Sequence, residues 1–552
     1  MRVRYIFSVL FIVAGLVLGG LGVLQKTLWA PSENITASTT LEDPGPLLVV
    51  DPGVLNLYDT PAKLTIEGEG DLVMVEQSKE FVDAWVGDTT HTNITGLSGE
   101  GALAAERTDG EQATAPNPAT GDTWNSVTTG EGTLELTWDE DPGRTTFLVA
   151  SDGTQPAATD VTVEWPNHAE TPWALPLIIG GAVLVVIGIV LAVTRWRRGR
   201  KDRARREARV ERRKKLVETG AAFAVVPAIA LAGCAPSPEL PTPQPAAAPS
   251  TAPASVTDEQ ITKILEDTAK VVADADGKTD AKALEPRAAG AFATQRNLAY
   301  EVKKKSEDFT LPPAVADQEV LVNWTTQTDT WPRITSVVAS DEEIGQTQYL
   351  VFSQEDVRAP YKLVAQTTLV PGVEFPSVAD ARAGALPVAG DSEDFVLKPQ
   401  DITGRYADVL THGDQSKFAG DFSVDALRLR LAGEQKNLTD SLASGNATVE
   451  FSYSADSNAL VVQQTADGAA IVTGVVGGTT TMTPEKEDDR VGKLSLTSPI
   501  SDIVGETETE QSVESTRQMQ VTFFVPKADA AEDARAVELI GVTDTMSGAE
   551  LK

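Results

Sequence analysis

The sequence predicts a membrane-anchored multidomain chain, in which two transmembrane helices flank a small all-β domain and a tandem α+β region follows. Three observations predict this class. Two apolar runs are each long enough to cross a bilayer. The residues between these runs alternate apolar and polar side chains, as strands do. Beyond residue 256, an order of helices followed by the strands of a curved antiparallel sheet occurs twice, which is typical of α+β domains.

Composition excludes several classes of protein. The 552 residues predict more than one folded unit, and a hydrophobic fraction of 41% excludes wholesale disorder. A single cysteine excludes an intramolecular disulfide framework, and the three histidines, His91, His168 and His412, are too scattered to favour a His-rich metal site. The formal net charge of -34 disfavours nucleic acid as a partner, because acidic surfaces repel phosphates.

The first apolar run, Tyr5 to Leu24, predicts a transmembrane helix within residues 1–24. Its 20 residues would span about 30 Å as a helix. A cleaved signal peptide is the alternative, but the run is long for one and no A-x-A-like site closes it. Gly15 and Gly19 form a G-x-x-x-G pattern, which lets another helix approach closely but is often incidental.

The second apolar run, residues 173–194, carries no charge and predicts a second transmembrane helix. Residues 195–215 follow it with thirteen Lys/Arg against three acidic residues, a net charge of +10. Basic loops stay on the cytoplasmic side, so this loop is expected inside and residues 25–172 outside. We favour this topogenic role for the loop over binding to anionic lipid or nucleic acid.

A third hydrophobic segment, residues 216–234, resembles a lipoprotein signal. Its uncharged core of 14 residues is short for a span but suits a signal peptide, and a basic flank precedes it. It ends in Leu231, Ala232, Gly233 and Cys234, which resemble the lipobox of bacterial lipoproteins. The resemblance implies that the Cys234 thiol receives diacylglycerol and that a peptidase cuts just before it. Residues 235–256 hold seven prolines among 22 and predict an extended tether.

This segment departs from the lipoprotein pattern in its position, because lipoprotein signals lie at the N-terminus. Internal cleavage and the joining of two genes both stay open, and Val210 could begin a separate lipoprotein. The alternative for the segment itself is a third membrane helix that buries an ordinary cysteine.

The folded parts predict one all-β domain and two α+β copies. Alternation at 133–138 and 161–165, with short apolar runs at 47–50, 63–67 and 72–77, predicts a small antiparallel sandwich. Copy one, residues 257–376, opens with a capping box at Thr257–Gln260. Copy two is residues 398–552. The predicted helices and strands are 288–305, 334–339, 348–353 and 361–369 in copy one, and 401–410, 423–442, 447–453, 460–464, 470–476, 518–525 and 536–543 in copy two.

This element order resembles the cone-shaped fold of nuclear-transport-factor-like domains. Together with the lipobox, it resembles uncharacterised envelope lipoproteins of high-GC Gram-positive (actinobacterial) species. Neither resemblance implies catalytic residues that can be carried over to this sequence.

Few residues suggest chemistry. Asp274 and Asp276 open the best metal candidate, but Gly277 and Lys278 stand where a calcium loop needs other residues, so a charged turn between helices is favoured. Tyr300, Trp324, Trp331 and Tyr361 could line a pocket, and core packing is favoured for each. The sequence therefore indicates no catalytic residue, no metal site and no cofactor.

The function that these observations favour is non-enzymatic. We expect a multi-pass cell-membrane protein or lipoprotein whose large domains lie on the extracytoplasmic face. Its partners would be cytoplasmic-membrane lipid and an envelope protein or cell-wall component that it binds or scaffolds. The alternative is a cell-wall glycan- or lipid-modifying enzyme that uses pocket carboxylates. The identity of the partner and the oligomeric state are not encoded in any recognisable motif.

Overall fold

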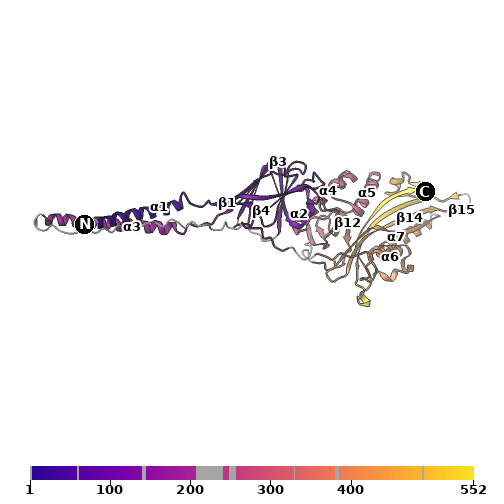
Figure 1. Cartoon of the computed structure of the whole chain (residues 1–552). Helices are drawn as coiled ribbons and strands as arrows, with labels where there is room; N and C mark the ends of the chain where they lie inside the picture. Colours follow the sequence, from indigo (N-terminus) through magenta and orange to yellow (C-terminus); the bar gives the residue numbers. More distant parts are fainter. Residues whose placement is uncertain are drawn as a thin grey trace.

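The molecule is elongated, with a pair of helices at one end, a β-barrel in the middle and the two α+β copies at the other end (Figure 1). The computed structural model describes residues 3–58, 61–139, 144–206, 240–247, 256–328, 330–379, 384–443, 446–487 and 490–552.

Helices α1 (Val3–Lys26) and α3 (Ala174–Arg206) pack against each other in antiparallel orientation. The stretches Ile6–Lys26 and Ala174–Thr194 are long and apolar enough to cross a membrane, which agrees with the two predicted helices. Helix α3 extends beyond the predicted span and continues through the basic residues as far as Arg206.

Small residues at every seventh position allow this pair to approach closely. A Cβ atom at Gly15 would lie 2.6 Å from the carbonyl oxygen of Gly181. The G-x-x-x-G pattern at Gly15 and Gly19 is therefore not incidental here, since a Cβ at Gly181 would lie 2.5 Å from the Gly19 nitrogen. The seam is longer than the G-x-x-x-G pattern: facing positions are Ser8 with Gly188, Gly15 with Gly181, and Gly22 with Ala174.

The barrel domain, residues 34–166, is one sheet of eight strands. Its strand order is β6-β3-β7-β2-β4-β5-β1-β8, and an additional pairing of β3 with β8 closes the sheet. Its elements are β1 (Asn34–Thr40), β2 (Leu47–Val50), β3 (Ala62–Ser78), α2 (Lys79–Val86), β4 (His91–Gly99), β5 (Ala102–Thr108), β6 (Ser126–Trp138), β7 (Thr145–Ala150) and β8 (Asp160–Pro166), with a short 3₁₀ turn η1 (Pro118–Thr120).

The predicted antiparallel sandwich is therefore wrong in its architecture, although the all-β class is confirmed. The two runs predicted at 63–67 and 72–77 form a single strand, β3, with a register shift between Glu67 and Asp71. On one side of this irregularity β3 pairs with β8, and on the other side it pairs with β7. Bulges bend strands, and this one allows one long strand to close a barrel. Two pairs, β2 with β4 and β1 with β5, are parallel.

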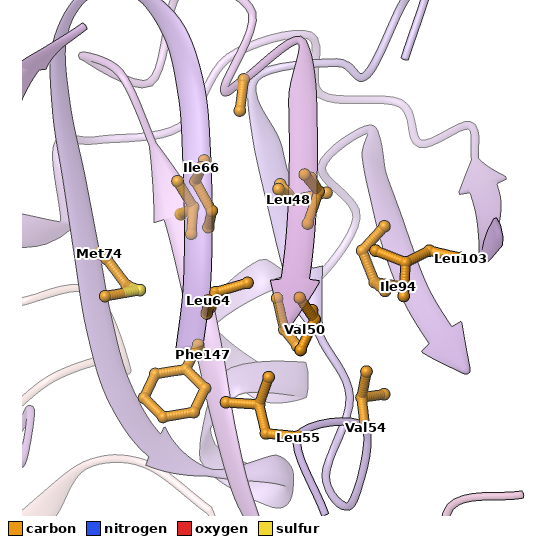
Figure 2. Close-up of a cluster of buried hydrophobic side chains, with 14 of the residues drawn as sticks. Leu48, Val50, Val54, Leu55, Leu64, Ile66, Met74, Ile94, Leu103 and Phe147 are labelled. Carbon is orange, nitrogen blue, oxygen red and sulfur yellow. The ribbon is translucent and has the colours of Figure 1, made fainter. Parts of the chain in front are cut away.

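Two apolar clusters hold the barrel together. Alternate residues of the strands fill its interior, where Leu48, Val50, Leu64 and Ile66 are fully or almost fully buried (Figure 2). The opposite side of β2, β3 and β7 is covered by the unpredicted helix α2, which buries residues Phe81, Val82, Trp85 and Val86.

The C-terminal region has the predicted order, helices before strands, twice. Copy one holds α4 (Asp258–Lys278), η2 (Ala281–Leu284), α5 (Gly290–Lys305), β9 (Glu319–Thr325), β10 (Arg333–Asp341), β11 (Gln346–Gln354) and β12 (Lys362–Leu369). Copy two holds α6 (Pro399–His412), η3 (Gly413–Gln415), η4 (Ala419–Asp421), α7 (Ala426–Ala443), β13 (Ala447–Gln464), β14 (Ala470–Pro484), β15 (Lys486–Glu487), β16 (Arg490–Val491), β17 (Leu494–Ser495), α8 (Ile500–Val504), β18 (Glu508–Thr509), β19 (Val513–Val525), η5 (Glu532–Ala534) and β20 (Glu538–Leu551).

The two copies share one antiparallel sheet of order β13-β14-β19-β20-β12-β11-β10-β9. The last strand of each copy therefore lies at the centre, where β12 pairs with β20 through Thr368 opposite Val542. The capping box at Thr257 is confirmed, because its side chain and that of Gln260 each accept the other's backbone N–H. The separately predicted strands 447–453 and 460–464 form one long strand, β13.

Buried amides tie the copies together at this junction. Gln520 donates from Nε2 to Oε1 of Gln295 on α5 at 2.7 Å, and its own Oε1 accepts the backbone N–H of Gln366 at 3.0 Å. Gln366 in turn donates to Gln348 at 2.9 Å. All four side chains are at most 2% exposed. A buried polar chain that is satisfied in this way specifies one arrangement of the two copies.

Replacing Gly15 by Leu should separate α1 from α3, because the added side chain meets the backbone of Gly181. We expect the association of fluorescently labelled peptides 1–30 and 170–206 in detergent micelles to weaken by about tenfold or more, measured by energy transfer. Gly20→Leu is the control, since nothing lies within 4 Å of a Cβ there. Equal effects of the two changes would show that the seam does not hold the pair.

Candidate functional site

A groove of about 270 Å³ lies in copy two between helix α7, helix α8 and the sheet. Apolar side chains form much of its wall, and polar groups gather at one side. The residues that line it are Leu431, Glu434, Gln435, Leu438, Phe451, Tyr453, Thr480, Met482, Ser495, Leu496, Thr497, Ile500, Ser515 and Arg517.

Regular secondary structure brings these residues together. Leu431, Gln435 and Leu438 are four and three residues apart on α7 and so lie on one face of that helix. Phe451 and Tyr453 are two residues apart on β13 and point to the same side of the sheet. The groove is thus built on helix and strand positions rather than on a loop.

Tyr453 is the hydrogen-bonding group at the polar side. Gln435 donates from Nε2 to the Tyr453 hydroxyl oxygen at 3.3 Å. Burial raises the pKa of the Tyr453 phenol above its ordinary value of 10.0, although the bond from Gln435 partly opposes this shift. The phenol therefore keeps its proton at neutral pH and can donate it to a ligand.

A network of four charged side chains closes the same side. Arg517 lies 3.3 Å from a carboxylate oxygen of Glu434 and 3.5 Å from one of Asp544. Arg430 bridges the same two carboxylates at 2.8 and 2.7 Å. Since each carboxylate has two cationic neighbours, Glu434 acts here as an ion-pair partner that holds α7 against β19 and β20.

The lining of the groove combines apolar walls with a few polar groups. Among the described residues that line the groove there is no histidine, lysine or cysteine. The carboxylate that lines it, Glu434, is paired with Arg430 and Arg517. Apolar walls with a few convergent polar groups are typical of binding sites.

A second, larger hollow of about 1630 Å³ lies beside the contact between the barrel and copy one. Its walls carry five carboxylates, and two of them already have cationic partners: Asp122 pairs with Arg287, and Asp267 with Lys263 and Arg287. The five are Asp122, Asp258, Glu259, Glu266 and Asp267. Within the described part of the chain, no group of three or more His, Cys, Asp or Glu is arranged to hold a metal ion.

The predicted lipidation site cannot be compared with the structure. Leu231, Ala232, Gly233 and Cys234 all lie outside the described residues. Cys234 therefore stays a prediction.

Asp274 and Asp276 lie within α4, so the prediction of a charged turn at these residues is wrong. Asp276 is held from the neighbouring helix: Arg296 donates to its two oxygens at 2.9 and 2.5 Å, and the Tyr300 hydroxyl donates at 2.6 Å. Asp276 has a structural role as the partner of a buried arginine.

Four aromatic residues were candidates for the lining of a pocket. All four instead lie in the core or at its edge, which agrees with the favoured expectation of core packing. Tyr300, Trp324 and Tyr361 are fully buried. Trp331 is half-buried, with the Arg333 guanidinium 4.2 Å from its ring centre. None of the four lines the groove.

Sequence reasoning missed the residues that do form the groove. Glu434, Tyr453 and Arg517 come from α7, β13 and β19, which are separated by long stretches of chain. Only the alternation along β13 gave a signal, and it indicated a strand rather than a binding site.

Comparison with known proteins identifies one family. A family model described as a domain of unknown function (DUF8094) matches residues 252–550. The match runs from just before α4 almost to the end of β20, so it takes in both copies as one unit. No curated protein and no solved structure matches the chain.

Filling the groove should block it. Leu438→Trp places a larger side chain between α7 and the sheet, and we expect a fragment of residues 252–552 to bind the apolar dye anilinonaphthalene sulfonate about tenfold more weakly. Leu429→Trp, at a position on the same helix that is 66% exposed and outside the groove, is the matched control. Fluorescence titration measures both. Unchanged dye affinity in Leu438→Trp would contradict binding in the groove.

Proposed function

This chain belongs to the family of domains of unknown function DUF8094, and on that premise we propose that it is a membrane-anchored, non-enzymatic cell-envelope protein that binds an extracytoplasmic partner. The groove of copy two is the observation that carries this proposal. It lies among α7, α8 and the strands β13, β14 and β19, and α7 and β14 are at the opposite end of the molecule from α1 and α3 (Figure 1). A partner could therefore reach it without meeting the membrane.

The groove's size and lining suggest the kind of partner. At about 270 Å³ it falls below the roughly 300–1,000 Å³ of typical small-molecule sites. Leu438, Phe451 and Met482 offer apolar contact, and the Tyr453 hydroxyl offers a hydrogen bond at the rim. These features suit a bulky apolar side chain of a protein segment, with the Tyr453 hydroxyl donating to a carbonyl oxygen of that segment.

Several features support attachment to the cytoplasmic membrane. The helices α1 and α3 are long and apolar enough to span it, and the basic residues 195–215 suit its cytoplasmic surface. The lipobox resemblance at 231–234 and the nuclear-transport-factor-like resemblance of the copies favour a multi-pass envelope lipoprotein with its large domains outside, as in high-GC Gram-positive bacteria. A diacylglyceryl group on Cys234 would add a stable anchor, because two acyl chains hold far better than one.

The alternative is a cell-wall glycan- or lipid-modifying enzyme. One observation favours it: the hollow between the barrel and copy one carries Asp258, Glu259 and Glu266, none of which has a cationic partner among the ion pairs described above. Turnover of cell-wall glycan or lipid by the purified chain, lost on changing one of these carboxylates to its amide, would establish the enzyme and overturn the binding proposal.

The binding proposal is tested by cross-linking from within the groove in intact cells. A photoreactive residue in place of Ser495, which lines the groove, should give one discrete adduct. The same residue in place of Leu429, which is exposed outside it, should not. Adding Leu438→Trp should reduce the adduct about tenfold. An adduct that is insensitive to Leu438→Trp would show that the partner binds elsewhere.

The anchor makes a separate prediction. Cys234→Ala should abolish incorporation of labelled palmitate into the protein, because the thiol is the attachment atom. If the natural chain is cleaved, the variant should accumulate at full length, whereas the wild type should yield a lipidated fragment beginning at residue 234. Metabolic labelling followed by gel electrophoresis measures both outcomes. A wild-type chain that is uncleaved and unlabelled would refute lipidation and leave residues 216–234 as a third membrane segment.

A further inference from the structure

We propose that the barrel domain is a dedicated docking partner for copy one, and that the two stay bound to each other when the chain between them is cut. The docking surface consists of α2 and residues 112–125 on the barrel, and of the start of α4, Arg287 and residues 357–361 on copy one. This inference does not depend on the proposed partner-binding function.

A buried carboxylate is the centre of the surface. Asp122 of the barrel accepts from both terminal nitrogens of Arg287, at 2.6 and 2.9 Å, and from the backbone N–H of Tyr361 at 2.9 Å. The Asp122 side chain is only 5% exposed and that of Arg287 only 13%. Every one of these bonds crosses from copy one to the barrel. If the domains separate, water must solvate this carboxylate and its partners again. Removing one member of such a buried pair is strongly destabilising, because the other charge is left without a partner.

Arg358 makes a second attachment, at the end of helix α2. Its guanidinium donates to the carbonyl oxygens of Trp85 and Val86 at 2.7 and 2.9 Å, and to side-chain oxygens of Thr89 and Gln112 at 2.7 and 2.9 Å. The carbonyls at the C-terminal end of a helix have no partner within it, and a cation there interacts favourably with the helix dipole. Arg358 of copy one therefore caps the C-terminal end of helix α2 of the barrel.

The third attachment couples the surface to the folding of copy one. Gln260, which closes the capping box of α4, donates from Nε2 to the carbonyl oxygen of Trp124 at 2.9 Å. The half-buried Val357 packs against the cluster that contains Trp85 and Trp124. Most of these contacts are buried or partly buried, and each hydrogen bond has a defined direction, as in a stable interface rather than an accidental encounter.

The docking surface also determines which side of a membrane the copies occupy. Helices α1 and α3 enter the barrel from the same end (Figure 1), and α3, at 33 residues, carries the chain about 50 Å away from it. Yet the segment at Pro243 is back on the barrel: Cβ atoms at Gly53 and Gly96 would lie 3.3 Å from its side chain, and Arg144 donates to the Ala246 carbonyl at 3.1 Å. The barrel and both copies therefore share one side, whether the chain returns through the membrane or is cut and lipidated.

The test uses the full chain with a specific protease site inserted between Ser250 and Thr251. Isolated membranes that carry it are treated with the protease and sedimented, and the fragment that begins at residue 251 is followed by immunoblot. This fragment lacks α1, α3 and Cys234, so it stays in the pellet only through a non-covalent contact, either the docking surface or a partner bound in the groove, and Leu438→Trp removes the second. We expect the wild-type fragment to stay in the pellet after washing. Release of the wild-type fragment into the supernatant would overturn the proposal.

Variants locate the attachment. Asp122→Ala and Arg358→Ala should each weaken retention by on the order of 100-fold, and the double variant should release the fragment. Arg107→Ala, which removes an exposed barrel arginine paired with Asp109 at 2.9 Å, is the matched control and should retain it. Leu438→Trp in the groove should also retain it, which separates this test from the binding proposal. Trypsin resistance of the released fragment checks that it is folded. Wild-type retention by the double variant would show that this surface does not hold the domains.

Discussion

The carboxylate of Asp122 is the constraint on which the arrangement of this molecule depends. It is buried where the barrel meets copy one, and its partners are a guanidinium and a backbone N–H of the other domain. A charge in such a place is tolerated only when it is paired and hydrogen-bonded. The barrel and copy one must therefore fold with matching surfaces, and the orientation of everything beyond copy one follows from that match.

Two different kinds of contact join the remaining parts of the molecule. Towards the helices, α1 and α3 meet through small residues at seven-residue intervals, where close backbone approach is the source of stability. Towards the C-terminus, the copies meet through the pairing of β12 with β20 and through a buried chain of glutamines that includes Gln295 and Gln520. Packing of small residues suits an apolar surrounding, whereas a satisfied polar chain fixes one register inside a water-soluble domain.

The two copies differ in the region that forms the groove of copy two. In copy one the space between the helices and the sheet is filled by Arg296 and Tyr300, which hold Asp276. Its strands β10 and β11 have 9 residues each, whereas β13 and β14 have 18 and 15. The additional length continues past the core of copy two, and it is this extension, covered by α7 and α8, that forms the groove.

Local patterns in the sequence determined the long helices and most of the strands, but not the short helices α2 and α8, because period and capping act over a few neighbouring residues. The apolar runs, the capping box at Thr257 and the helix-then-strand order all reappear in the structure. Tertiary structure alone decided the closure of the barrel, which depends on a bulge within β3, and the role of Asp276, which depends on Arg296 from another helix. It alone also brought Asp122 to Arg287 across 165 residues of chain and Tyr453 to Arg517 in one groove. No pattern among neighbouring residues predicts such pairings. The sequence contains many similar charges and aromatic rings, and long-range packing determines which of them contact each other.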